Sequence, residues 1–581
     1  MQDRRKLCNN PTVSNNVGTT AIPTIWSPGY FALIFCLVLA IILVAYYLYH
    51  IRPYVLLPAD ILMWAETNFV GDIIKLRIGA PFYTDPVDSN SGIYCFGAPV
   101  VTYAISWLFG KSTSIVAWRI IQLFFVLCAA IVGTVCCRML YERAYPDYRT
   151  PYHKTWLVFI FLTLLLTGTA PEANFYSHCL HTEALALVFS TLCLWMMLFY
   201  LKSPSWKRLI LMAAFPALGF MVKQVLLCWA VVMFFCLLVY NPRDLKRLGV
   251  FIASVSMFIG ITLGVCYWLW GDNFFFWTFE IMGGDRKFIS LLSTKTFRVS
   301  LPRSLDHTVR ILPEIAIGIL GGCLIFREKE NIRTLGPLWV AWLVLICIEA
   351  YSSGVGWSVF WHFGPGIFIG VIWLFSALPR FWPIPNKNGE SEFALLFYWT
   401  RPLIAIVGIL TFFTIMHVVP SADEYETRYY KRRPSPDVYR YIADIEREFE
   451  GFQADKVLLD IGNWIYLRHS VLAKDRAVSL ADQPPNGIYD NLEVMITRIR
   501  NKTYDKILLH DFHSPYFLYD WANWERSSGV KKALLEHYTE VRTIPSVKMD
   551  QLGKTMIQYT GPVSVLIPKQ DLNLKSTSRD L

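Results

Sequence analysis

Charged side chains are scarce in this sequence. Of its 581 residues, Asp, Glu, Lys and Arg make up only 17%, whereas hydrophobic residues make up 54%. A water-soluble chain of this length normally carries more charge and divides into several domains. The scarcity of charge therefore excludes an ordinary soluble enzyme and predicts a protein with several membrane helices.

Cysteine pairs and concentrated positive charge are also lacking. The 13 cysteines include no CxxC pair, and most lie inside apolar runs, where cysteine behaves as a small hydrophobic residue. The net charge of +10 is spread over short basic clusters between apolar runs. These absences argue against a disulfide scaffold, and they favour membrane topology over a nucleic-acid partner as the source of the basic clusters.

Eleven apolar runs are candidate membrane helices, because a bilayer core of ~30 Å takes about 20 residues of helix, or fewer where a helix is short. They are residues 29–50, 116–138, 155–171, 183–201, 209–222, 225–240, 248–270, 308–326, 334–351, 358–378 and 402–420. The fifth and sixth runs could form one long helix. Lys223 and Gln224 between them instead predict a tight break at a membrane surface.

Positive charges predict the orientation, because cytoplasmic connections are enriched in Lys and Arg. The N-terminal tail, residues 1–28, is expected in the cytoplasm, and the connections on that side carry Lys or Arg: 139–154, 202–208, 241–247, 327–333 and 379–401. The short connections 172–182 and 352–357 carry neither. This alternation requires that 94–109 does not cross, so we expect it to lie in the outer interface of a cytoplasmic (inner) membrane.

Three long regions then lie outside the cytoplasm. Residues 51–115 and 271–307 are external loops of the membrane part, which spans 29–420, and residues 421–581 form a tail. The tail has an amphipathic run from Asp437 and two apolar segments, KVLLDIG and DKILLHDF, which are typical of buried strands. It lacks a glycine-rich phosphate loop and metal-ligand spacing. We predict a small extracytoplasmic α/β domain.

Unusual polar residues gather on the outer side. They are Asp60, Glu66, Lys75, Arg77, Tyr83, Glu172, His178, His181, Glu183, Lys223, Arg286 and His362. Several have an ordinary structural explanation: an acidic residue can cap a helix, and a lysine can extend its ammonium to the surface. Two histidines without a third ligand are a weak metal signal. Together, however, a carboxylate base beside cations suits transfer from a phosphate ester that carries a lipid tail.

The first external loop resembles that of GT-C fold glycosyltransferases. The residues that carry the resemblance are Asp60, Gly79-Ala-Pro-Phe-Tyr-Thr-Asp-Pro86, Tyr94, Pro99 and Leu108-Phe-Gly110, followed by Thr182-Glu183, Gly219-Phe-Met-Val-Lys223 and His362-Phe-Gly-Pro365. The pattern is most similar to prokaryotic relatives of protein O-mannosyltransferases and of the lipid A aminoarabinose transferase. It departs at Ile61, Met63 and Ala98, where those enzymes often have an acidic residue, Arg and Lys, so the phosphate contacts must differ.

The resemblance implies a polytopic α-helical membrane protein of GT-C fold, with about eleven membrane helices and the C-terminal extracytoplasmic α/β domain. It implies a hexosyl- or pentosyltransferase that uses a polyprenyl-phosphate sugar, with a glycan, lipid or protein as acceptor. Catalysis maps to Asp60 and Glu183. Donor-phosphate binding is assigned to Lys75, Arg77, Lys223, Arg286 and His362, and acceptor or sugar binding to Glu66, Tyr83, Glu172, His178 and His181.

No residue is assigned to a metal, and the need for a divalent ion is left open. Two other classes of function are compatible with a polytopic chain. A transporter or flippase of lipid-linked sugars predicts inverted repeats and polar groups at the membrane midplane. A non-catalytic scaffold predicts an inert membrane part, against which Glu183 and Lys223 argue.

Overall fold

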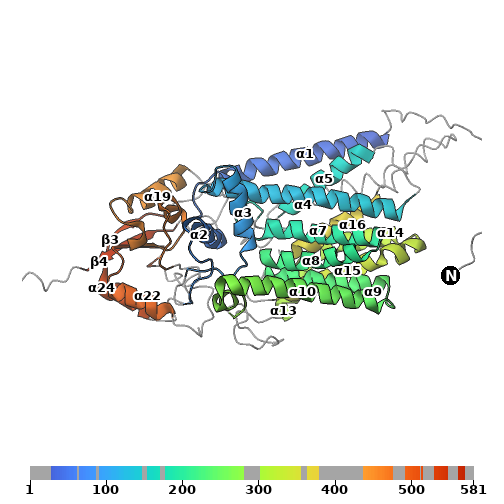
Figure 1. The fold of residues 1–581 in the computed structure, drawn as a ribbon. Coiled ribbons are helices and arrows are strands. Elements are labelled where there is room, and N and C mark those ends of the chain that lie inside the picture. The colour runs from blue at the N-terminus through green and yellow to red at the C-terminus, as the bar shows by residue number, and fades with distance from the viewer. Residues whose placement is uncertain are drawn as a thin grey trace, which may run out of the picture.

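The computed structural model places two groups of elements side by side, a helix bundle and a C-terminal unit (Figure 1). It describes residues 28–61, 64–86, 90–146, 153–170, 177–280, 301–354, 363–378, 436–475, 491–510, 512–513, 529–546 and 561–569. The bundle is built from the described residues up to 378, and the C-terminal unit from those between 436 and 569. Two short helices of the first external loop, α2 (Trp64–Ile78) and α3 (Gly97–Leu108), lie between them (Figure 1).

The bundle consists of long apolar helices that run roughly parallel. Its elements are α1 (Pro28–Val55), α4 (Ile115–Ala144), α5 (His153–Thr169), α7 (Glu183–Lys202), α8 (Trp206–Val222), η1 (Gln224–Cys228), α9 (Trp229–Tyr240), α10 (Leu245–Trp270), α11 (Asp272–Phe275), η2 (Phe276–Glu280), α13 (Leu301–Arg310), α14 (Leu312–Ile325), α15 (Lys329–Ser353) and α16 (Gly364–Ala377). Among the described residues, five helices are long and apolar enough to cross a membrane, or six if a bent pair counts as one span.

Those five helices show that the chain is a membrane protein. The expected total of eleven spans stays a prediction. Three of the predicted spans form apolar helices shorter than 18 residues: Lys154–Thr169, Gln224–Tyr240 and Gly364–Ala377. The predicted span 402–420 lies outside the described residues. The positions of the other runs agree with the helices to within a few residues.

One predicted span is wrong in its course. The run 308–326 is not a single helix, because α13 ends at Arg310 and α14 begins at Leu312 with a bend of 65° between them. Pro313 lies in the first turn of α14 and has no N–H to continue the hydrogen bonding of α13. The break therefore follows from a proline that the apolar pattern alone conceals.

The predicted break at Lys223 is present. Its backbone is extended, with φ −153° and ψ 129°, and it separates α8 from η1 and α9. An extended residue between helices leaves backbone groups outside the helical ladder, which a chain tolerates best where polar partners are available.

The segment 94–109 forms α3 (Gly97–Leu108), whose 12 residues rise only about 18 Å and cannot cross a bilayer. In Figure 1 it runs across the direction of α4 rather than beside it. Gly97 permits its close approach to α8, since a Cβ there would stand 2.5 Å from the carbonyl oxygen of Met221. A short helix that crosses the others is what the charge alternation required.

The C-terminal unit contains one four-stranded sheet with helices around it. Its elements are α19 (Pro436–Arg447), η5 (Ala454–Lys456), β1 (Val457–Leu459), α20 (Trp464–His469), α22 (Asn491–Arg500), β2 (Lys506–His510), α24 (Gly529–His537), β3 (Tyr538–Ile544) and β4 (Val563–Pro568). The order is β1-β2-β4-β3, with β1 parallel to β2 and the other pairs antiparallel. The strands expected at KVLLDIG and DKILLHDF are β1 and β2.

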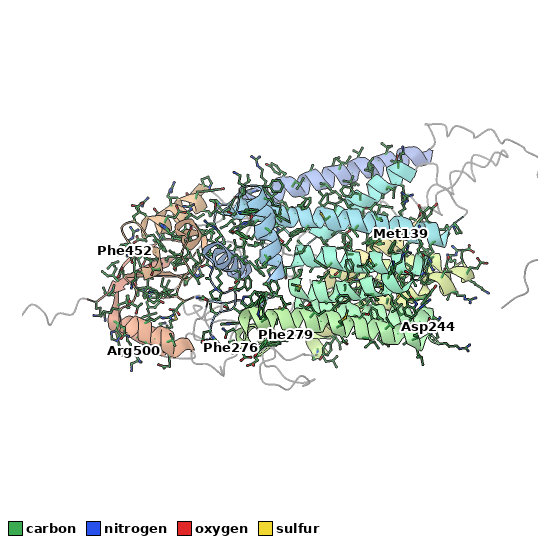
Figure 2. All side chains as sticks on the ribbon, in the orientation of Figure 1. Met139, Asp244, Phe276, Phe279, Phe452 and Arg500 are labelled. Carbon is green, nitrogen blue, oxygen red and sulfur yellow. The ribbon has the colours of Figure 1, made fainter. Side chains whose placement is uncertain are left out.

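Helix α2 (Trp64–Ile78) of the first external loop joins the helix bundle to the C-terminal unit. One hydrophobic cluster contains Trp118 of the bundle, Phe69 of α2 and Trp464 of α20. In Figure 2, Phe276 and Phe279 mark the end of the bundle that faces the C-terminal unit, and Met139 and Asp244 mark the opposite end. We call the first of these the domain end.

Candidate active site

An ion pair at the domain end joins two residues predicted from the sequence. Glu183 begins α7, and Lys223 occupies the extended break after α8. The Lys223 Nζ lies 2.7 Å from Oε1 and 2.8 Å from Oε2 of Glu183. Each side chain is only 13% exposed. A mostly buried ion pair in which the ammonium contacts both carboxylate oxygens is stronger than a surface ion pair. The remaining exposure leaves both groups accessible to a ligand.

A neutral histidine lies beside this pair and packs against two aromatic rings. His181 Nδ1 is 3.8 Å from Glu183 Oε1. The His181 ring meets Phe69 and Tyr94 edge-on, at centroid distances of 5.1 and 5.5 Å. Burial lowers the pKa of His181 to about 4, so its ring carries no charge near neutral pH. The wall beside the carboxylate is therefore apolar and adds no competing cation.

Lys223 can donate one further hydrogen bond while it is paired with Glu183. An ammonium has three N–H donors, and the two bonds to Glu183 account for two of them. Lys223 has no other hydrogen-bond partner among the residues that the structure describes. It can therefore donate to an incoming anion while the carboxylate of Glu183 stays beside it, ready to accept a proton.

Asp60 lies where the first loop meets the C-terminal unit. Its side chain is fully buried, and its carboxylate accepts the N–H of Asn463 at 3.0 and 2.9 Å and the N–H of Trp464 at 3.0 Å. Burial raises its pKa to about 6, against the opposing effect of these hydrogen bonds. In this arrangement both oxygens are taken up by the C-terminal unit, so the catalytic role predicted for Asp60 stays a prediction.

Glu66 is a buried residue that stabilises the first external loop. Its carboxylate is fully buried and pairs with Arg119 of α4, with the Nε–Oε1 distance at 2.9 Å, and it also accepts the N–H of Leu180 at 3.0 Å. Arg119 donates in addition to the carbonyl oxygens of Tyr54, Leu57 and Ala59. This network fixes both the segment before Asp60 and the turn before Glu183, and the acceptor or sugar contact expected for Glu66 stays a prediction.

Three further loop residues hold the loop itself. Lys75 is fully buried and donates to the carbonyl oxygen of Phe82 at 2.8 Å and to Ser91 Oγ at 2.9 Å. Arg77 donates to the carbonyl oxygen of Leu467 in α20, and the hydroxyl of Tyr83 donates to the carbonyl oxygen of Tyr94. None of these bonds reaches Glu183 or Lys223, so the structure does not bring Lys75, Arg77 or Tyr83 to the ion pair by direct contact.

His178 is buried against Tyr54, with ring centroids 5.9 Å apart, and burial lowers its pKa to about 3. It packs beside the Glu66 network rather than beside Lys223. The remaining predicted residues, Glu172, Arg286 and His362, lie outside the described residues. Within the described ranges, no three His, Cys, Asp or Glu side chains are grouped as ligands of a metal ion.

One acidic residue near the pair was not predicted from the sequence. Glu349 lies in α15, four residues before its end, and is 4% exposed. The charge of Lys223 acts on it, and its Oε1 accepts the N–H of Gly366 at 3.1 Å. An acidic residue inside an apolar span is a signal of function in its own right, so the sequence did contain a pointer to it.

Comparison with known proteins supports the fold. The sequence matches no protein-family description and no curated protein sequence. The structure is similar to that of ArnT from Cupriavidus metallidurans in the apo state, at 12% identity and a TM-score of 0.50, over 92% of this chain and 98% of that one. It also matches the archaeal oligosaccharyltransferase AglB from Archaeoglobus fulgidus in complex with an inhibitory peptide and a dolichol-phosphate, at 10% identity and a TM-score of 0.47, over 87% and 72% of the two chains.

The match to ArnT extends over almost the whole of both chains. At this identity, what the likeness establishes is architecture. It agrees with the resemblance that the first loop carries in sequence. The chain therefore has the membrane-embedded, GT-C-like fold of GT-C glycosyltransferases.

Proposed function

We propose that this protein is a membrane glycosyltransferase that takes a sugar from a polyprenyl-phosphate donor and transfers it to an acceptor hydroxyl at the domain end of the bundle. The main support for the proposal is the mostly buried ion pair of Glu183 and Lys223 at that end. A carboxylate and an ammonium with a spare donor are the two groups that such a transfer needs. The GT-C-like fold makes a glycosyl group the expected cargo.

The two residues take complementary parts in the reaction. Lys223 donates to a phosphate oxygen of the donor and offsets the negative charge that grows there as the sugar–phosphate bond breaks. The acceptor oxygen forms a bond to the anomeric carbon, and the polyprenyl phosphate leaves with the bonding electrons. Glu183 accepts the proton of the acceptor hydroxyl. The wall of His181, Phe69 and Tyr94 excludes water, which would otherwise compete as acceptor.

The donor's lipid tail is expected to lie along the apolar helices, with its phosphate at the break before η1. This placement needs the domain end to be the outer side of an inner membrane, as the distribution of Lys and Arg predicts. The donor is expected to carry a hexose or pentose, and the acceptor to be a glycan, lipid or protein.

The proposal puts Glu183 before Asp60 as proton acceptor. Both carboxylates accept hydrogen bonds, but Glu183 is 13% exposed, whereas Asp60 is fully buried against Asn463 and Trp464. Asp60 acts on the reaction only if the C-terminal unit releases it. Matched variants of the two acidic residues separate these roles.

The experiment uses the full chain in proteoliposomes with a radiolabelled polyprenyl-phosphate sugar. The proposal predicts label in an acceptor product, with Glu183→Gln abolishing transfer while the protein still assembles. Label that crosses the bilayer unchanged would identify a flippase, and label that does neither would leave a scaffold. Full transfer by Glu183→Gln would remove Glu183 from the reaction.

A further inference from the structure

A second buried acid stands close to the proposed phosphate position. Glu349 lies near the end of α15, and Lys223 of the break and Cys228 of η1 both interact with it electrostatically. Its two oxygens have different surroundings. Oε1 accepts the N–H of Gly366 in the first turn of α16, whereas Oε2 is buried and has no hydrogen-bond partner in the part of the chain that the structure describes.

Gly366 is required for this placement. A Cβ on residue 366 would overlap Glu349 Oε2 and the Cδ1 of Ile346. The carbonyl oxygen of Gly366 is held in turn by Trp342 Nε1 at 2.8 Å. The carboxyl group is therefore fixed from one side by the backbone of α16, and its second oxygen is held in place without a partner of its own.

The pattern of bonds fits a protonated carboxyl group. A carboxyl group surrounded by apolar side chains is at lower free energy when it keeps its proton. A neutral carboxyl group has one carbonyl oxygen, which accepts, and one hydroxyl, which donates. Oε1 already has its donor, and the unpartnered Oε2 is then an O–H that needs an acceptor.

Two donors without acceptors thus lie near each other at the domain end: the third N–H of Lys223 and the O–H of Glu349. Both donors can bind an acceptor that has several lone pairs, and phosphate oxygens are such acceptors. We propose that Glu349, as a neutral acid, donates a hydrogen bond to the phosphate of the lipid-linked donor alongside Lys223. The inference rests on the proposed function and adds a phosphate-binding residue to it.

A neutral acid suits this task better than a second cation. It donates to the phosphate without adding another fixed charge that would have to be desolvated in the apolar part of the bundle. An ionised Glu349 would instead repel the phosphate. Among the described residues at this end, the ionisable groups on elements packed around α15 are Lys223 of the break, Cys228 of η1, Arg119 of α4, and Arg303, Asp306, His307 and Arg310 of α13; α16 has none. His307 is bonded to the carbonyl oxygen of Ser353.

The variant Glu349→Gln separates this proposal from its alternatives. Glutamine keeps an oxygen for the Gly366 N–H and an N–H₂ donor for the phosphate, but it cannot ionise. The probe is a polyprenyl monophosphate, with the unphosphorylated polyprenol as reference, binding to the full chain in lipid nanodiscs. Binding is measured at neutral pH.

The proposal predicts that Glu349→Gln binds the phosphate about as well as wild type near neutral pH, and that Glu349→Ala binds it about tenfold more weakly or worse. The matched control is Glu314→Ala, which removes another acid of the bundle, 5% exposed and with an unpartnered oxygen among the described residues. It leaves binding unchanged.

Two results overturn the inference. If Glu349→Ala binds the phosphate as wild type does, Glu349 does not touch it; if Glu349→Gln binds as poorly as Glu349→Ala, an ionised carboxylate is needed instead. Lys223→Met in the same assay tests the proposed function separately. Loss of binding in Lys223→Met together with normal binding in Glu349→Ala rejects only the inference, and normal binding in both rejects the phosphate site itself.

Discussion

Lys223 contacts both carboxylate oxygens of Glu183, at 2.7 and 2.8 Å, across forty residues of sequence. The contact joins the start of one apolar helix to the break at the end of another. Because each residue begins or ends a helix at the domain end, neither has to be buried at the centre of the bilayer. The pair thus provides a charged site at the edge of an apolar bundle, which is where we propose that the donor's phosphate binds.

Removing each member of the pair is expected to give a different kinetic defect. Lys223→Met should raise the donor KM about tenfold or more, because a phosphate contact is lost, whereas Glu183→Gln should lower kcat by about 10²–10⁴. Steady-state kinetics with a polyprenyl-phosphate sugar measure both. Lys207→Met, at the other end of α8, is the control. Equal effects of Lys207→Met and Lys223→Met would mean that the charge acts through stability alone.

Asp60 is expected to hold the C-terminal unit on the first loop. In Asp60→Ala, the amides of Asn463 and Trp464 lose their acceptor, so their hydrogen exchange should speed up about ten- to hundredfold. Exchange followed by mass spectrometry in nanodiscs reports it. Asp72→Asn changes another buried acid of the same loop and should leave those amides protected. Unchanged exchange in Asp60→Ala would contradict the docking role.

The docking is expected to depend on pH. Burial raises the pKa of Asp60 to about 6 in the docked state, above the value of about 4 for a free aspartate. A raised pKa means that the stabilisation is complete below the free value and is lost as the pH rises through about 6, by up to about 3 kcal/mol. After correction for intrinsic rates, the amides of Asn463 and Trp464 should be better protected in mild acid than at neutral pH. Asp60→Asn should remove the slope; a slope of opposite sign would refute the linkage.

The buried pair of Glu66 and Arg119 is expected to be a main support of the loop. Arg119→Met leaves the Glu66 carboxylate and three carbonyl oxygens without their donor, and should destabilise the protein by about 3–5 kcal/mol. Arg138→Met breaks an exposed pair with Glu142 and should cost less than about 1 kcal/mol. Unfolding in mixed micelles compares them. Similar losses of stability in the two variants would show that the Glu66 network stabilises the protein no more than an exposed ion pair does.

Features that depend on local chemistry were predictable from the sequence. The break at Lys223 follows from two polar residues inside an apolar run, and the short helix α3 follows from the alternation of basic connections. The strands β1 and β2 follow from apolar segments of strand length. The bend before α14 shows the limit of the same method, because one proline inside an apolar run decided the course of the chain.

Features that depend on tertiary contact were not predictable. The sequence marked Glu183 and Lys223 separately but could not pair them, because the turn and the helix break that bring them together are set by the packing of α7 on α8. Asp60 looked like a free carboxylate because its partners, Asn463 and Trp464, follow about four hundred residues later. Glu349 looked like one polar residue in a long helix until the position of α16 showed which of its oxygens is used.

The central claim, that the Glu183–Lys223 pair receives the donor's phosphate, is tested most directly by cryo-electron microscopy of the full chain in nanodiscs with a polyprenyl monophosphate. The account predicts phosphate density within about 3 Å of Lys223 Nζ, with the lipid tail leading away along the apolar helices. Phosphate density elsewhere on the protein, with Lys223 still bonded only to Glu183, would contradict it.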